Sequence, residues 1–159
     1  MGLDMKTSRI VIFALVMTSA AGAAQAQDSR NCQRQELIGT WSLAKIESAQ
    51  PGVQQFYNQS PNEVMRFSPN GAFIYVARRT PYSASEAKSS LDNADAVDGV
   101  TYTFRLQGDQ LILLREGTPF EGFRCAIAVK DGGQMKRGDM VLTNLPNRPD
   151  LRRIQRKLN

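Results

Sequence analysis

Apolar and polar residues alternate along several short stretches of this chain, with the period of half-buried β-strands. The clearest example is VTYTFRL, residues 100–106, in which every second side chain is apolar or aromatic. The polar turn QGDQ separates it from LILLRE, residues 111–116, a second run rich in strand-forming residues. Together these segments predict a β-hairpin.

Two further hairpins follow the same pattern. In NEVMRFSPNGAFIYVARR, residues 62–79, the turn Pro69-Asn70-Gly71 separates two alternating runs. GFRCAIAVK, residues 122–130, ends at the turn DGGQMKRG, and the alternation resumes in DMVLTNL, residues 139–145. The segment GTWSLAKIE, residues 39–47, predicts a first strand that precedes all three hairpins.

The C-terminal segment fits two kinds of element. Leu151, Ile154 and Leu158 fit one face of a helix, whereas every second residue from 152 to 158 fits one face of a strand. We favour the strand, because it brings the total to about eight, enough to close a small barrel that has no exposed edge. The predicted fold is all-β, a single antiparallel up-and-down β-barrel of about eight strands.

Two longer segments interrupt the strands. Residues 80–99 are rich in Ser, Ala and Asp, and Ser85 to Leu91 predicts about two helical turns with Ser83 or Ser85 as the N-cap. A segment of this length is either a lid over one end of the barrel or a surface excursion. Residues 48–62 pose the same choice, and their Phe56-Tyr57 pair suggests that they fold back onto apolar surface.

The N-terminus predicts an export signal. Lys6 and Arg9 flank the start of an apolar run, and small residues occupy Ala24-Gln25-Ala26. Residues 1–26 would be removed, leaving residues 27–159 as one barrel domain. The apolar run is shorter than the roughly 20 residues that a spanning helix needs. We therefore expect a periplasmic or secreted protein that does not span the membrane.

The chain contains two cysteines, Cys32 and Cys125. Because an exported protein enters an oxidising compartment, we expect them to form a disulfide. The chain-entropy relation gives such a bridge about 4–5 kcal/mol of stabilisation, less any strain. The alternative is a pair of free, buried thiols.

Positive charge is concentrated at the C-terminus. Residues 27–147 carry thirteen basic and thirteen acidic residues, while the last twelve residues carry five basic residues and one acidic residue. The tail lacks the interleaved aromatic residues of a nucleic-acid surface, so no nucleic-acid partner is expected. An anionic membrane surface, an acidic protein partner and an ordinary solvated face remain as interpretations. We expect a monomer.

The residue types restrict the chemistry. The chain has no histidine, which removes the commonest general base and a principal zinc ligand. A disulfide would also remove thiolates as nucleophiles or metal ligands. The spacing of Asp92, Asp95 and Asp98 does not fit a calcium loop. We expect no catalytic site, no metal site and no cofactor.

Gly39-Thr40-Trp41 at the start of the first strand resembles the Gly-x-Trp signature of the lipocalins and their calycin relatives. The turn Pro69-Asn70-Gly71 is similar to one found in small bacterial lipocalin-like domains. In that family the Trp closes the bottom of the barrel and an arginine from the last strand lies across its ring. The resemblance implies structural roles for Gly39 and Trp41, with Arg153 or Arg156 as the arginine.

The resemblance implies a non-catalytic barrel that binds a small apolar or amphipathic molecule. Candidate lining residues are apolar or aromatic side chains on the predicted inner faces: Met65, Phe67, Phe73, Tyr75, Tyr102, Phe104, Leu111, Leu113 and Ile127. The alternative is a calycin-type inhibitor or interaction module with a filled barrel that engages a protein partner. With Trp41 at the closed end, we expect any ligand at the other end, under residues 48–62 and 80–99.

Overall fold

The computed structural model describes residues 28–97, 102–145 and 151–158. The predicted signal, residues 1–26, lies outside this part of the chain. The elements follow one another as β1 (Ser29–Asn31), α1 (Arg34–Leu37), β2 (Gly39–Glu47), α2 (Pro51–Tyr57), β3 (Asn62–Phe67), β4 (Phe73–Arg78), α3 (Ala84–Val97), β5 (Tyr102–Gln107), β6 (Gln110–Arg115), β7 (Thr118–Ala128), β8 (Met140–Leu145) and β9 (Arg152–Leu158).

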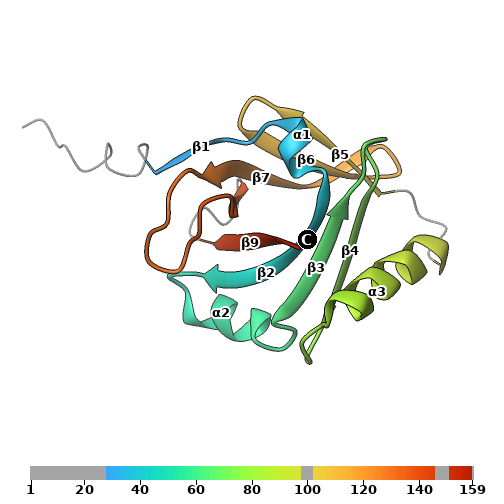
Figure 1. Cartoon of the computed structure of the whole chain (residues 1–159), viewed down its shortest axis with the longest axis horizontal. Coiled ribbons are helices and arrows are strands. Elements are labelled where there is room, and N and C mark those ends of the chain that lie inside the picture. The colour runs from blue at the N-terminus through green and yellow to red at the C-terminus, as the bar shows by residue number, and fades with distance from the viewer. Residues whose placement is uncertain (1–27, 98–101, 146–150, 159) are drawn as a thin grey trace, which may run out of the picture.

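Eight of the strands form an antiparallel up-and-down β-barrel, as the alternation predicts (Figure 1). Their order is β4-β3-β2-β9-β8-β7-β6-β5, and every neighbouring pair is antiparallel. The C-terminal segment is a strand, and it pairs with both β2 and β8. The last strand therefore joins the first half of the sheet to the second half.

The barrel has one unsealed seam, between β4 and β5. Within the described residues, the two edges meet at the bridge between Ala72 and Thr103 and at a hydrogen bond from Phe104 N to Gly71 O of 2.9 Å. The expectation that closure removes both edges was wrong here. β4 continues into the connection to α3 instead of turning directly back into β5, so no hairpin aligns the two strands.

The three predicted hairpins are confirmed over the residues that the structure describes, and Val100 and Thr101 lie outside them. In the first hairpin, Gly71 has φ of +92°, a backbone conformation that favours glycine. Asn70 Oδ1 accepts a hydrogen bond of 3.0 Å from Ala72 N. The turn residues thus fix the register in which Met65 pairs with Tyr75.

The helix predicted in residues 85–91 is longer than expected and lies outside the barrel. α3 packs against the outer face of β3 and β4, where Val64, Ile74, Ala87 and Leu91 form a small apolar cluster (Figure 1). The lid interpretation was wrong for α3. Ala87 and Leu91 are one helical turn apart, so they form a stripe that must be buried, and the outward side chains of β3 and β4 supply the surface.

Two small elements before β2 were not predicted from the sequence. β1 pairs with β7, and Cys32, just after it, forms the predicted disulfide with Cys125 of β7. α1 then leads into β2. Strand β1 and helix α1 together make a short segment, Ser29–Leu37, that is fastened to the barrel wall.

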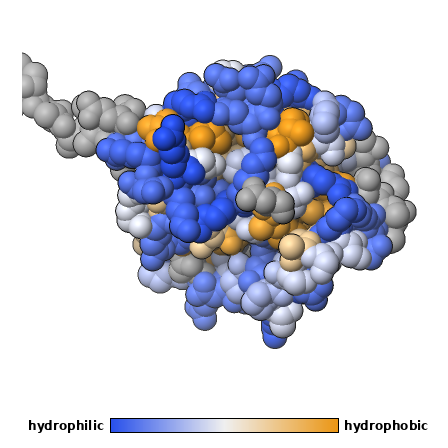
Figure 2. All heavy atoms as spheres, viewed as in Figure 1, coloured by the Kyte–Doolittle hydropathy of each residue, from blue (hydrophilic) through white to orange (hydrophobic). Residues whose placement is uncertain are grey.

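Apolar side chains fill the barrel from the end that holds Trp41. One continuous cluster includes Cys32, Leu37, Trp41, Phe67, Phe123, Cys125, Met140 and Leu142. In the space-filling view, hydrophobic residues show at the centre of the face within a hydrophilic surround (Figure 2). Among the described residues, no helix is long and apolar enough to cross a membrane.

Candidate functional site

Seven of the nine predicted lining residues are part of the packed interior. Each is no more than 5% exposed, and all belong to one apolar cluster: Met65, Phe67, Phe73, Phe104, Leu111, Leu113 and Ile127. The Phe67 ring centroid lies 5.1 Å from that of Phe73 and 5.0 Å from that of Phe104. Tyr102 packs against the cluster, whereas Tyr75 is 44% exposed. These residues fill the barrel beside Trp41, and their contact with a ligand stays a prediction.

Trp41 is buried at the end covered by α1. Its Nε1 donates a hydrogen bond of 2.7 Å to the carbonyl oxygen of Leu37, the last residue of that helix. The cation over its ring is Lys157, with Nζ 5.2 Å from a ring centroid of the indole. The expectation of Arg153 or Arg156 in this place was wrong. Lys157 pairs directly with Trp41 across β2 and β9, so the two side chains share the inner face.

Gly39 makes room for this lysine. It has φ of +130°, and a Cβ atom built on it would lie only 2.7 Å from Cε of Lys157. Any side chain would therefore meet both an unfavourable backbone conformation and a steric clash. The positive φ explains the glycine of the Gly-x-Trp pattern, and the aliphatic part of Lys157 lies where its Cβ atom would be.

The inner face changes from apolar to polar toward the opposite end of the barrel. On β3, the inward series of Phe67 and Met65 continues with Glu63, two residues earlier in the chain. On β7, Cys125 and Phe123 are followed by Glu121. On β9, Arg153 lies two inward positions beyond Lys157. We call this region the mouth cluster, formed by Tyr57, Glu63, Tyr75, Glu121, Asn144, Arg153 and Gln155.

Arg153 lies at the centre of the mouth cluster and is 7% exposed. Its Nη2 donates a hydrogen bond of 2.8 Å to the hydroxyl oxygen of Tyr57 in α2 and lies 3.7 Å from Oε1 of Glu121. The guanidinium is 5.0 Å from the ring centroid of Tyr57 and 5.5 Å from that of Phe123. Asn144 Nδ2 donates a hydrogen bond of 3.1 Å to the same Glu121 oxygen.

Glu63 is the second buried charge of the cluster, at 2% exposed. Its Oε1 accepts a hydrogen bond of 2.6 Å from Gln155 Nε2, and its Oε2 accepts one of 3.3 Å from the Tyr75 hydroxyl. Burial raises the pKa of Glu63 above its ordinary value, although Arg153 and the two donors act against the rise. The pKa of Tyr75 is raised as well, first by burial and then by the charge of Glu63.

The guanidinium of Arg153 stays charged in this environment. Burial acts to lower the pKa of Arg153, but the carboxylates of Glu63 and Glu121 act in the opposite direction, and the net shift is upward. The mouth cluster thus contains one firmly held positive charge between two acidic groups. Such an arrangement can orient a small polar group by hydrogen bonds and charge.

Three buried polar atoms of the cluster have no hydrogen-bond partner among the described residues. They are Arg153 Nε, Gln155 Oε1 and Asn144 Oδ1. A buried polar atom without a partner is costly, and each one in a native protein calls for an explanation. The mouth cluster therefore contains one donor and two acceptors without a partner among the described residues.

Most of this site was not predicted from the sequence. Arg153 was expected in a different role, and the predicted lining residues were apolar or aromatic, which left out Glu63, Glu121, Asn144 and Gln155. The alternation of side chains along the strand could have indicated Glu63, because Glu63 continues the inward series of Met65 and Phe67. A charged residue at an inward position of a barrel strand marks either a strand end or a site.

Residues 48–62 do reach the mouth, as expected for one of the two loops. They contain α2, which carries Tyr57 to Arg153. α3, from the other loop, packs instead on the outside of the barrel. Only one of the two predicted loops therefore contributes a described contact to the site.

Comparisons of the chain with protein-family models, curated protein sequences and solved structures gave no match. The nearly closed antiparallel barrel is consistent with the calycin architecture without being specific to it. Fold and site together define a class: a disulfide-linked β-barrel with an apolar interior and a charged, buried mouth. This architecture is compatible with a ligand-binding role.

Proposed function

We propose that this protein is an exported, lipocalin-like binding protein that holds a small amphipathic molecule at the mouth of its barrel without chemical reaction. The observation that carries the proposal is the buried Arg153, flanked by Glu63 and Glu121, at the polar end of a barrel whose other end is filled by apolar side chains. The disulfide is consistent with an oxidising compartment outside the cytoplasm.

A purely structural role accounts poorly for this cluster. Replacing a buried ion pair by apolar residues of similar volume is often neutral or stabilising. A barrel selected for stability alone would therefore continue its apolar packing to the mouth. Charges retained in such a place, beside polar atoms without partners, fit a site that recognises the polar group of a ligand.

The composition of the cluster favours a ligand that donates hydrogen bonds. It has two acidic groups for one guanidinium, and two unpartnered acceptors for one unpartnered donor. An amine or a hydroxyl supplies the missing donors. The apolar part of the molecule would lie against Phe123, which belongs to the apolar cluster, and Tyr102, which packs against that cluster.

The test compares ligands of one chain length that differ only in their polar group: dodecylamine, dodecanol and dodecanoate. We expect the amine and the alcohol to raise the melting temperature in a saturable way, and the carboxylate to have less effect. The double variant Arg153→Met with Glu121→Gln should stay folded and lose the response. Equal, unsaturable shifts for all three compounds, or a response that survives in the double variant, would contradict the proposal.

The readout of this test cannot be Trp41 fluorescence. Trp41 pairs with Lys157, whereas Ile46 pairs with Arg153. Five residues of strand place the indole roughly 15 Å from the mouth cluster. Thermal shift, mass spectrometry of the intact complex and organic extraction of the purified protein are suitable instead.

A second function is favoured by the packing of the interior. Since the seven most buried candidate lining residues contact one another in one cluster, the barrel beside Trp41 is filled. A filled barrel fits a calycin-type inhibitor or interaction module that uses its surface. A protein that yields no extractable molecule, ignores all three probes and inhibits an exported metalloprotease would support this second function.

A further inference from the structure

A concave region lies at the end of the barrel that holds Trp41, away from the mouth cluster. It encloses a volume of about 310 Å³, and we call it the base pocket. Arg30 of β1, Glu36 of α1, Lys157 of β9 and Arg137 of the β7–β8 connection form its polar walls, and Trp41 and Ile127 contribute apolar surface. A volume of this size is at the lower end of the range for small-molecule sites.

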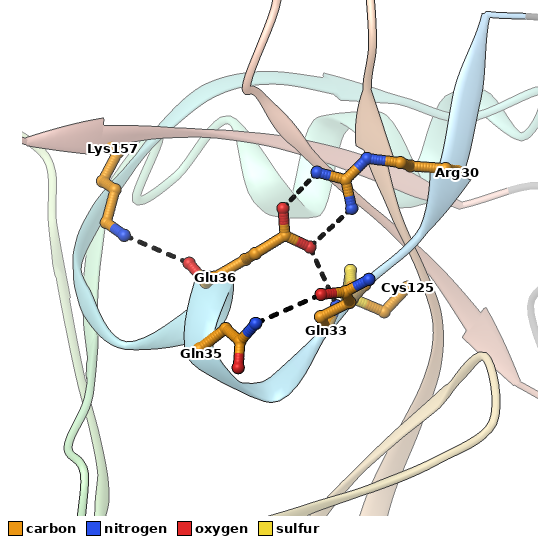
Figure 3. Close-up of polar contacts among 7 residues, drawn as sticks. Arg30, Gln33, Gln35, Glu36, Cys125 and Lys157 are labelled. Carbon is orange, nitrogen blue, oxygen red and sulfur yellow. Dashed lines mark hydrogen bonds and ion pairs between the residues drawn. A yellow bond between two sulfur atoms is a disulfide. The ribbon is translucent and has the colours of Figure 1, made fainter.

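The single carboxylate of the base pocket is already fully engaged. Both guanidinium Nη atoms of Arg30 donate to Glu36, and Gln33 N donates to Glu36 Oε2 over 3.0 Å (Figure 3). The hydrogen bond from Arg30 is the main reason that the pKa of Glu36 is lowered, so this carboxylate is ionised at neutral pH. Arg30 and Glu36 thus neutralise each other, which leaves two positive charges in the lining.

Lys157 is the first of these two charges. The other three cations of β9 each lie within 4 Å of a carboxylate: Arg152 with Glu47, Arg153 with Glu121, and Arg156 with Asp139. Lys157 has no carboxylate within 4 Å among the described residues, although its charge also acts on Glu36 and helps to lower the pKa of that group. Its Nζ donates to the carbonyl oxygen of Glu36 over 3.1 Å, which leaves two of its three N–H donors for another group (Figure 3).

Arg137 is the second charge. Its backbone N donates to Asp131 Oδ1 over 2.7 Å, which fixes this part of the connection. Its guanidinium has no hydrogen-bond or ion-pair partner within the described part of the chain. Its neighbour Lys136 does not line the base pocket, so the two adjacent cations offer a matched comparison.

The walls of the base pocket are held in place before anything binds. The Cys32–Cys125 disulfide fastens the segment that carries Arg30 and Glu36. Gln33 and Glu36 form a reciprocal capping box at the start of α1. Lys157 is held over Trp41, in the space that Gly39 leaves. A fixed site loses little conformational entropy when a ligand binds.

We infer that the base pocket binds a small anion through Lys157 and Arg137, with a carboxylate or phosphate group as the part recognised. The inference is independent of the proposed function, because none of the mouth-cluster residues lines this pocket. In the arrangement that we expect, one anionic oxygen accepts a hydrogen bond from the Lys157 ammonium and a second accepts one from the Arg137 guanidinium. Hydrogen bonds between charged groups are stronger than those between neutral groups.

The test is a titration of the oxidised protein with inorganic phosphate at constant ionic strength, followed by NMR. The Trp41 indole N–H and the Gly138 amide report on the pocket, since Trp41 lies under Lys157 and Gly138 adjoins Arg137. We expect both resonances to shift with one saturable curve. Arg137→Gln should weaken binding about tenfold, as expected for one charge-assisted hydrogen bond, and Lys136→Gln less than about twofold.

Two sources of the anionic group are distinguished by a second titration. A tripeptide with a free C-terminal carboxylate is compared with its amidated form, and acetate serves as the free small anion. Saturable binding of phosphate, acetate or the free-acid peptide that weakens in Arg137→Gln supports the inference. Shifts that follow ionic strength alone, or equal weakening in Arg137→Gln and Lys136→Gln, overturn it.

Discussion

At the scale of single residues, Glu63 is the least expected side chain in this protein. It occupies an inward position two residues from Met65, at 2% exposed, and its carboxylate is held by Gln155 and Tyr75. Burial disfavours its ionised form, and the nearby Arg153 favours it. The net effect is a raised pKa, so Glu63 makes the stability of the barrel depend on pH.

We expect the wild type to lose stability relative to Glu63→Gln as the pH rises. An acid with a raised pKa in the folded state stabilises fully below its unfolded value, and this contribution disappears as the pH passes through the folded value. The decline should therefore begin near pH 4.5, the ordinary value. Urea denaturation from pH 4 to pH 8 measures the difference.

The control for this experiment is Glu116→Gln, which removes one carboxylate from the exposed turn between β6 and β7. The charged and titratable groups near Glu63 are Arg153, Glu121, Tyr57 and Tyr75, and they are the same in both variants. A difference between wild type and Glu63→Gln that is constant across the range would show that Glu63 has the same pKa folded and unfolded.

At the scale of secondary structure, α3 shows how a polar connection becomes an ordered part of the wall. Ser83 and Glu86 form a reciprocal cap: Ser83 N donates to Glu86 Oε2 over 2.8 Å, and Glu86 N donates to Ser83 Oγ over 3.3 Å. These bonds, with Arg78, hold the pKa of Glu86 at about 2. The cap fixes where the helix begins and so which face meets β3 and β4.

Removing the cap should loosen α3 without opening the barrel. We expect Ser83→Ala to lower the free energy of unfolding by about 1 kcal/mol and to speed amide exchange in α3 selectively. Ser89→Ala, at an exposed position in the middle of the same helix, is the matched control and should be neutral or slightly stabilising. Equal effects of the two substitutions would show that the cap does not stabilise the helix.

At the scale of the whole molecule, the disulfide joins the N-terminal segment to a late strand. The two cysteines are separated by 93 residues, and both are buried. The closed loop contains most of the barrel, from α1 to β7. The bond therefore restricts the unfolded chain strongly, and in the folded state it holds β1 and α1 over Trp41.

The double substitution Cys32→Ala with Cys125→Ala should cost about 4–5 kcal/mol of stability by loop-closure entropy. Because β2 to β9 keep their own pairing, we expect a folded barrel with a lower urea midpoint. Trp41 fluorescence measures this transition, since the indole lies under the segment that the disulfide fastens. A midpoint equal to that of the oxidised wild type would show that the bond constrains little.

Most strands of the barrel followed from alternation, and the reason is local. The inward side chains of β3, β5 and β7 beside Trp41 had to be apolar for burial, so period two appears in the sequence itself, whereas β6 appears as a continuous apolar run. The site did not follow in this way. Glu63, Glu121 and Arg153 are far apart in the chain, and their signs and spacing do not reveal that they meet.

The sequence by itself determined the class of fold, the hairpin turns and the disulfide pairing, and it narrowed the N-cap of α3 to Ser83 or Ser85. The turns and the cap depend on neighbouring residues, and the chain has only two cysteines to pair. The tertiary structure alone decided that β4 and β5 leave a seam, that α3 lies outside the barrel and that Lys157 rather than an arginine covers Trp41. It also decided that Arg153 lies among buried acids. These outcomes depend on cross-strand register and on competition for one interior, which no local pattern encodes.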